Sequence, residues 1–118
     1  MQLVDKLNLI ANCLDDKKGR RITALDVAEL TSISDYFVIC GAGSQSQVKA
    51  LADNVCEKLL ENGFEPVHIE GYRDATWVLI DYSDIVVHIF TDEMREFYDI
   101  ERLWTDAKEV TLDLSDND

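Results

Sequence analysis

Basic residues are the scarcest feature of this sequence. Its 118 residues include eleven lysines and arginines against twenty-four aspartates and glutamates, which gives a formal net charge of −13. Direct nucleic-acid binding draws its affinity from basic side chains that displace counterions from phosphates, so this composition predicts little direct contact with RNA or DNA. One adjacent basic cluster is present, Lys17–Lys18 with Arg20–Arg21, beside Asp15–Asp16. The acidic balance suits a basic partner, although solubility alone is the simpler explanation of the charge.

Cysteine is also scarce, and long apolar runs are missing. The three cysteines, Cys13, Cys40 and Cys56, are odd in number, lack CxxC spacing and lie in apolar sequence. This pattern predicts buried, reduced thiols in a cytosolic protein. Residues 1–15 carry an amphipathic pattern with acids rather than a signal peptide, and no apolar run approaches membrane-spanning length. We therefore expect a cytoplasmic protein with no membrane contact.

The hydrophobic pattern that is present predicts one small α/β domain. Hydrophobic residues make up 47% of the chain, enough for a single core. Apolar residues recur at helical spacing from Leu3 to Leu14, with Gly19 as the candidate C-cap. The unbroken apolar run within Asp35–Cys40 indicates a strand in the sheet centre. Pro66 precedes Val67–Glu70 and suits an edge strand there. The remaining helices are predicted over Gln45–Asn62 and Asp92–Tyr98, and strands over Ile22–Val27, Asp35–Cys40 (central) and Val67–Glu70 (edge).

A hairpin from Trp77 to Phe90 organises the domain. Two apolar runs of strand length flank a short polar turn, Ser83–Asp84. If that turn has two residues, Tyr82 faces Ile85, and one almost wholly apolar face lies under the helices. That face comprises Val78, Ile80, Val87 and Ile89. The opposite face mixes aromatics with an acid and a histidine: Trp77, Leu79, Asp81, Val86, His88 and Phe90.

The chain becomes acidic after Trp104. We expect a domain over residues 1–104, followed by an acidic, mobile tail over residues 105–118. Val110, Leu112 and Leu114 alternate with polar residues, so a weak edge strand is the alternative for part of this tail.

A glycine-containing loop and a cysteine are the first two candidates for chemistry. Gly41–Ser44 lies between a strand and a helix, as in many phosphate sites, but no GKS/T follows and the GxGxxG pattern is incomplete. A tight turn with Ser44 as N-cap is the preferred interpretation. Cys40 follows an apolar strand, and no basic neighbour lowers its pKa, which argues against a cysteine hydrolase.

Two histidines and two aspartates are the third candidate. His68, Asp81, Asp84 and His88 are metal-ligand types, but they lack a tight ligand spacing. We prefer a hydrogen-bonded His–Asp pair within the sheet, and we expect no metal and no cofactor.

Taken together, these motifs closely resemble the ribosome silencing factor family, also called Iojap-like. The match runs from about residue 3 to Trp104, and its motifs are specific in combination. Ser83 departs from the pattern, because the family usually has glycine before the Asp–Val run. The residues that carry the resemblance are Ala24–Val27, Asp35–Cys40, Gly43–Ser44, Gln47–Lys49, Glu70–Gly71, Trp77–Leu79, Asp81, Asp84, Val86–His88, Arg95–Tyr98 and Leu103–Trp104.

The resemblance implies a fold and a role. The fold is a small mixed sheet of about five strands flanked by helices, related to nucleotidyltransferases. The role is that of a non-enzymatic repressor that binds the large ribosomal subunit through its ribosomal protein number fourteen. It would block joining of the small subunit and slow translation when nutrients run short. The contacts implied are Trp77, Tyr82 and Tyr98, with Asp81, Asp84, His88 and Arg95 as second-line surface residues.

A nucleotidyltransferase-like enzyme with a metal-bound nucleotide is the alternative. Two-metal phosphoryl transfer needs carboxylates that converge on the ions. Enzymes of that fold place two acids at alternate positions on the strand after the helix, whereas Val67–Glu70 holds one. We therefore expect no catalytic residue. The stripe of the first helix and the aromatic residues each suit a homodimer of the free protein, so the sequence leaves the oligomeric state open.

Overall fold

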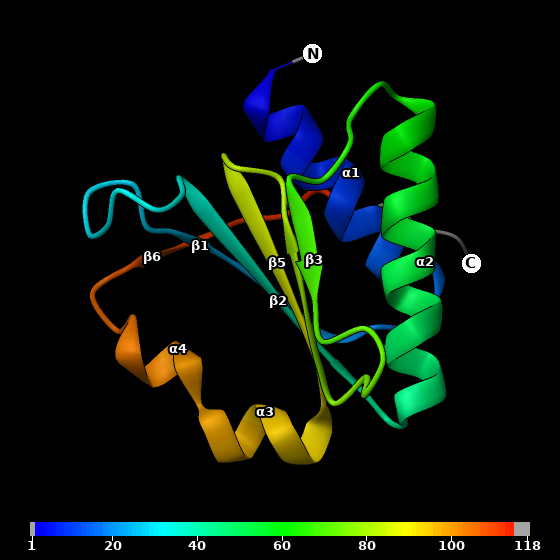
Figure 1. Ribbon diagram of the computed structural model, residues 1–118. Helices are drawn as coiled ribbons and strands as arrows, with labels where there is room; N and C mark the ends of the chain where they lie inside the picture. Colours follow the sequence, from blue (N-terminus) through cyan, green and yellow to red (C-terminus); the bar gives the residue numbers. More distant parts are fainter. Residues whose placement is uncertain (1, 115–118) are drawn as a thin grey trace.

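A computed structural model describes residues 2–114 and shows a sheet with helices on both faces (Figure 1). The longer helices, α1 (Leu3–Asp16) and α2 (Gln45–Glu61), cover one face. The short helices α3 (Asp92–Tyr98) and α4 (Ile100–Leu103) lie across one end of the other face. Among residues 2–114, no helix is long and apolar enough to cross a membrane.

The sheet has six strands in the order β3-β4-β5-β2-β1-β6. Neighbouring strands are antiparallel except for the central pair β2 and β5, which run parallel, so the sheet is mixed as expected. The sheet centre and the edge position of the strand after Pro66 are both predicted correctly. The strands are β1 (Arg20–Asp26), β2 (Tyr36–Ala42), β3 (His68–Glu70), β4 (Trp77–Asp81), β5 (Ile85–Thr91) and β6 (Lys108–Val110).

The hairpin register matches the prediction. Val78 pairs with Ile89, Ile80 pairs with Val87, and the backbone N–H of Tyr82 donates to the carbonyl of Ile85. The apolar face of the hairpin packs into the core beneath α1 and α2. The strict two-residue period of a strand fixes which side chains share a face. The alternation of apolar and polar residues was therefore sufficient to predict the two faces of the hairpin.

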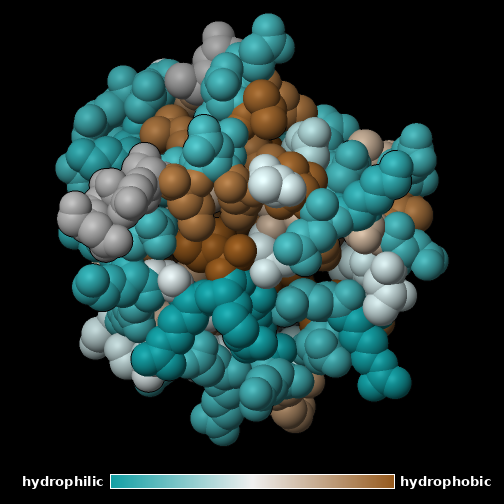
Figure 2. All heavy atoms as spheres, turned by 180° about the vertical axis from the view of Figure 1, so that it is seen from behind, coloured by the Kyte–Doolittle hydropathy of each residue, from teal (hydrophilic) through white to brown (hydrophobic). Residues whose placement is uncertain are grey.

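The end of the chain takes part in the fold more than the predicted tail implied. β6 pairs with β1 as a sixth strand over Lys108–Val110, which overlaps the weak edge strand suggested by the alternating residues only at Val110. Beyond it, the backbone N–H of Asp113 donates to Asn8 of α1 at 2.9 Å. Figure 2 shows the side of the molecule that faces away from the viewer in Figure 1. Apolar side chains gather in the middle of this side, within a hydrophilic rim. Residues 115–118 of the predicted tail lie outside the described part of the chain.

Two turns depart from the expected glycine chemistry. Lys18, not the predicted Gly19, takes the left-handed conformation after α1, with φ of +64°. Gly19 is needed for a different reason: there is no room for a side chain, because a Cβ there would lie 2.5 Å from Sγ of Cys40. In the hairpin turn, Ser83 has φ of +75°, a conformation that glycine adopts without steric cost. The departure from the family pattern therefore falls on the position where glycine fits best.

Candidate functional site

An aromatic cluster forms where the hairpin meets α3. Trp77 begins β4 and pairs with Phe90 near the end of β5, and their rings stack with centroids 4.9 Å apart. Tyr98, the last residue of α3, lies against this pair, 4.8 Å from the Trp77 ring centroid. Phe90 is fully buried and Trp77 half-buried, whereas 45% of Tyr98 is exposed. The structure thus brings Trp77 and Tyr98 into one patch.

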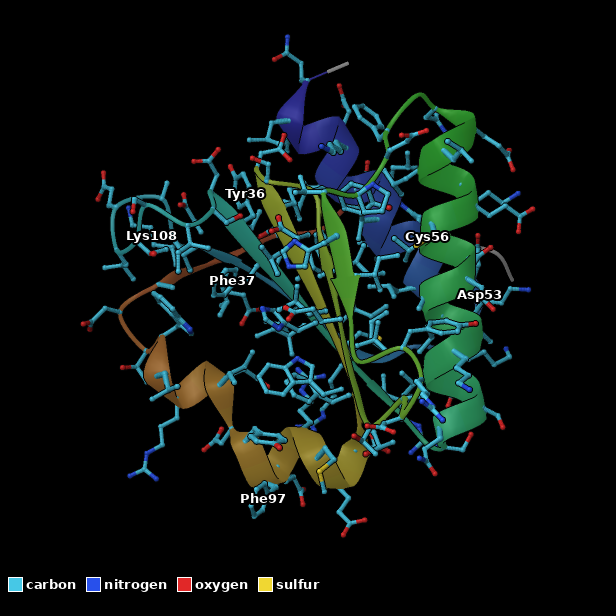
Figure 3. The ribbon with its side chains drawn as sticks, in the orientation of Figure 1. Tyr36, Phe37, Asp53, Cys56, Phe97 and Lys108 are labelled. Atoms are coloured by element: carbon cyan, nitrogen blue, oxygen red, sulfur yellow. The ribbon has the colours of Figure 1, made fainter. Side chains whose placement is uncertain are left out.

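His88 supports this cluster from within the sheet. Nε1 of Trp77 donates a hydrogen bond to Nδ1 of His88 at 3.2 Å, which leaves the proton of the neutral imidazole on Nε2. Phe37 packs edge-on against the His88 ring on the face that α3 and α4 cover (Figure 3). Burial lowers the pKa of His88 from 6.5 to about 4. The expectation of a surface histidine is wrong in this structure, because α3 and α4 cover the strand face that carries it.

Arg95 is also buried, although the sequence suggested a surface residue. Only 3% of it is exposed. Its Nε donates to Glu101 of α4 at 2.8 Å, and its Nη1 donates to the backbone carbonyl of Arg20 at 3.0 Å. A third, longer contact reaches the hydroxyl of Thr23. Arg95 therefore fastens α3 and α4 to β1, and it fixes the helix that carries Tyr98.

Tyr82 lies far from the cluster. It precedes the hairpin turn, at the opposite end of β4 from Trp77, and its side chain points to the face beneath α1. Only 5% of Tyr82 is exposed, and Nζ of Lys6 lies 5.3 Å from its ring centroid. Its hydroxyl is buried beside the thiol of Cys56. Tyr82 thus occupies a core position, and Trp77 and Tyr98 form the patch without it.

The two aspartates of the hairpin have separate structural partners. Asp84 accepts from Nζ of Lys6 at 2.8 Å, which ties the turn to α1. Asp81 accepts from the backbone N–H of Ser83 at 2.7 Å and lies 3.5 Å from Nδ1 of His68 on β3. The hydrogen-bonded His–Asp pair predicted from the sequence is not among the hydrogen bonds of residues 2–114, and His68 at the exposed edge only approaches Asp81 at ion-pair distance. Because His88 bonds to Trp77 instead, the four candidate metal ligands do not converge.

The remaining candidates for chemistry are used by the fold. The Ser44 hydroxyl accepts from the backbone N–H of Gln47 and caps α2, as predicted. Gln47 in turn accepts from the backbone N–H of Gly43 at 2.7 Å, so its side chain fills the glycine loop. Cys40 is a free, buried thiol, and burial raises its pKa to about 12. A thiol with that pKa stays protonated near neutrality and is a poor nucleophile.

Two exposed apolar residues lie on α3 and α4, and sequence reasoning did not single them out. Phe97 is 74% exposed and Leu103 77% exposed, in contrast to the core positions expected of such side chains. Phe97 points away from the sheet (Figure 3), and its ring centroid lies 5.1 Å from that of Tyr98. We call Trp77, Phe97, Tyr98 and Leu103 the α3–α4 surface. Their helical spacing resembled a buried stripe, so only the tertiary arrangement revealed their exposure.

Acidic side chains border the α3–α4 surface. Glu93, Glu96 and Asp99 are exposed on or beside α3, and Asp92 in its first turn is partly exposed. Apolar anchors within a charged rim are the usual anatomy of a protein-binding site. An acidic border of this kind is electrostatically complementary to a basic surface.

Comparisons with known proteins agree with the overall fold. Residues 1–118 match a family described as "Ribosomal silencing factor during starvation". The chain is 40% identical to the Bacillus subtilis ribosomal silencing factor RsfS, with 94% of each chain covered. It is 29% identical to the chloroplastic protein Iojap of Zea mays, over 87% of this chain and 45% of that one. A crystal structure from Chromobacterium violaceum superposes with a TM-score of 0.87 at 36% identity, and covers 98% of this chain and 95% of that one.

Proposed function

This chain belongs to the ribosomal silencing factor family, and from that membership we propose that it represses translation by binding the large ribosomal subunit. The contact is made with ribosomal protein number fourteen on the face that receives the small subunit. The bound protein prevents subunit joining and slows translation under nutrient limitation. The folded chain measures 34 × 33 × 31 Å along its principal axes. A body of this size is large enough to keep the two ribosomal subunits apart.

The α3–α4 surface is the contact in this proposal. The packing of Tyr98 on Trp77 carries the argument, because it sets an exposed aromatic ring on a half-buried indole that stacks on the buried Phe90. Aromatic residues bury a large area at a small cost in conformational entropy, which makes them common anchors of interfaces. The acidic rim supports a basic ribosomal protein as the partner and would speed its encounter.

The other residues implied by the family resemblance act from behind this surface. Arg95 holds α3 in place, and His88 orients the Trp77 ring through its hydrogen bond. Tyr82, Asp81 and Asp84 stabilise the far end of the hairpin, so their effect on binding is indirect.

The proposal assigns no reaction to the chain. A nucleotidyltransferase-like enzyme has no specific observation in its favour, because β3 carries Glu70 as its one acid and Asp81 is engaged with His68 and the turn. The protein acts in the cytoplasm, where ribosomal subunits join. A homodimer of the free protein stays a prediction.

Sedimentation tests the proposal directly. Purified protein is mixed with isolated large subunits, then with small subunits, and the mixture is resolved on a sucrose gradient. We expect the protein to migrate with the large subunit and the joined ribosome peak to shrink. Full joining in the presence of bound protein would contradict steric exclusion, and absence of binding would contradict the proposed partner.

A further inference from the structure

The sole adjacent basic cluster of the sequence forms a rigid turn in the fold. Lys17, Lys18, Arg20 and Arg21, here called the basic turn, contain four of the eleven lysines and arginines, and all four are exposed. They connect α1 to the start of β1. Whole-chain charge conceals such a cluster, because acids distributed elsewhere outweigh it.

Side chains from two helices hold the backbone of the basic turn. Nε2 of Gln47 donates to the carbonyls of Lys17 at 3.2 Å and of Lys18 at 3.0 Å. Nη1 of Arg95 donates to the carbonyl of Arg20 at 3.0 Å. Three of the four basic residues thus have their carbonyls fixed by α2 or α3. The backbone of the basic turn is therefore already ordered before a ligand binds.

The backbone conformation of the turn is also unusual for long side chains. Lys18 and Arg21 have φ of +64° and +48°, and the pairing of β1 with β2 shifts register between Arg20 and Thr23. A bulge of this kind redirects the side chains around it. Left-handed conformations at residues other than glycine cost on the order of 1 kcal/mol and persist where the surroundings impose them.

The charges of this turn are largely available. Arg20 is paired with Asp92 of α3. Within residues 2–114, no ion pair engages Lys17, Lys18 or Arg21. The neighbouring acids Asp15 and Asp16 belong to the last turn of α1 and reduce the local positive charge without reversing it.

The basic turn lies beside the beginning of α3, the helix that carries Phe97 and Tyr98. β2 and β5 are parallel and Ala42 pairs with Thr91, so α2 and α3 begin at the same end of the sheet. Arg20 pairs with Gly41 near that end, which places the basic turn there as well (Figure 1). The two features are joined physically through the Arg20–Asp92 pair and the hydrogen bond from Arg95.

We infer that the basic turn contacts RNA phosphates of the large subunit while the α3–α4 surface contacts protein, an inference that rests on the proposed function. Lys17, Lys18 and Arg21 supply the charges, and Gln47 and Arg95 hold them in place. Phosphate is the anion that a ribosomal surface presents at the highest density. Flexible lysines and an arginine can bind the phosphates of an RNA backbone without recognising its base sequence.

The salt dependence of binding tests this inference. The double variant K17Q/R21Q removes two charges from the basic turn. The control K58Q/K108Q removes two charges at the other end of the sheet, since the partly exposed Lys58 lies late in α2 and the exposed Lys108 pairs with Asp26. Both variants carry the same net charge, so nonspecific repulsion from the subunit is equal. Thermal melts establish that each is folded.

We expect K17Q/R21Q to bind large subunits about tenfold more weakly than the control at about 0.1 M salt, with the difference shrinking as salt rises. The slope of log affinity against log salt should fall by about two, roughly one for each phosphate that the variant leaves unneutralised. Equal affinities and slopes for the two variants would overturn the inference alone. Failure of the wild-type protein to bind would overturn the proposed function, and the inference with it.

Cross-linking separates RNA from an acidic protein as the ligand. A benzophenone-bearing amino acid replaces Lys17, and the complex with large subunits is irradiated. An adduct that ribonuclease digests is expected. An adduct that resists ribonuclease and yields to protease would overturn RNA as the ligand of the basic turn.

Discussion

Nε1 of Trp77 donates a hydrogen bond to Nδ1 of His88 across adjacent strands, at 3.2 Å. The bond requires the neutral imidazole, since a protonated Nδ1 has no lone pair to accept with. The half-buried indole of the proposed contact surface is therefore held by a histidine that must stay uncharged. Four predictions concern this arrangement and the elements around it.

Stability should fall in mild acid because of His88. Burial lowers its pKa to about 4 in the folded protein, against 6.5 ordinarily, so between these values the unfolded chain binds the extra proton. Stability is thus complete above pH 6.5 and declines as pH falls toward 4. From about pH 7 to about pH 5 the free energy of unfolding, measured with urea, should drop by about 2 kcal/mol more in wild type than in His88→Leu.

His68 provides the control for that experiment, as the second of the two histidines and one that is exposed. His68→Gln should keep the full decline of the wild type. A His88→Leu protein that loses stability as steeply as the wild type over the same pH range would contradict the assignment.

The hairpin turn offers a stabilising substitution. Ser83 has φ of +75°, where a side chain is strained and glycine is not. Ser83→Gly should raise the free energy of unfolding by about 0.5–1 kcal/mol, the relief of strain less the added freedom of the unfolded chain. Ser83→Ala keeps a Cβ and should bring no such gain. Equal urea midpoints for the two variants would show that the turn is unstrained.

Loss of the Arg95 side chain should destabilise the attachment of α3 and α4. Arg95→Met removes hydrogen bonds to Glu101 and to the carbonyl of Arg20, so both acceptors lose a donor in a partly buried place. We expect a loss of about 2–3 kcal/mol in the free energy of unfolding. Arg102→Met, on the exposed side of α4, should change it by less than about 0.5 kcal/mol. Similar losses in the two variants would remove the special role of Arg95.

Binding to large subunits should depend on the exposed rings of α3. Phe97→Ala and Tyr98→Ala should each weaken co-sedimentation about tenfold or more, with little change in thermal stability, because both side chains are substantially exposed. Trp77→Ala should weaken binding too, but it also removes packing against Phe90. Ile33→Ala is the matched control, since Ile33 is 69% exposed in the loop at the other end of β2. An equal loss of binding in Ile33→Ala would place the interface elsewhere.

Local sequence rules accounted for the framework of the fold. Ser44 caps α2 as the sequence predicted, and Thr91 caps α3 with the same kind of side chain. The apolar run of β2 lies in the sheet centre, and Pro66 precedes an edge strand. Each of these features depends on residues that are close together in the sequence. The tail was the exception. The pairing of Lys108–Val110 with β1 is a long-range contact, and the local composition of a short, acidic segment does not predict it.

The site was only partly predictable for the same physical reason. Trp77 and Tyr98, both contacts implied by the family resemblance, lie side by side in the structure. The exposure of Phe97 and Leu103 was hidden, since an apolar helical stripe next to a core looks identical whether it faces inward or outward. The burial of Arg95 depends on a contact with Arg20, 75 positions away in the chain.

The division of side chains in the Trp77–Phe90 hairpin follows from local sequence alone. The two-residue period of a strand assigns Val78, Ile80, Val87 and Ile89 to one face whatever surrounds them. What covers each face depends on tertiary packing. α3 and α4 fold back over the second face through the Arg95 contacts, which buries His88, exposes Tyr98 and leaves Tyr82 at the far end, beneath α1. Periodicity is a local property of the backbone, whereas coverage is set by packing between segments that are distant in the chain.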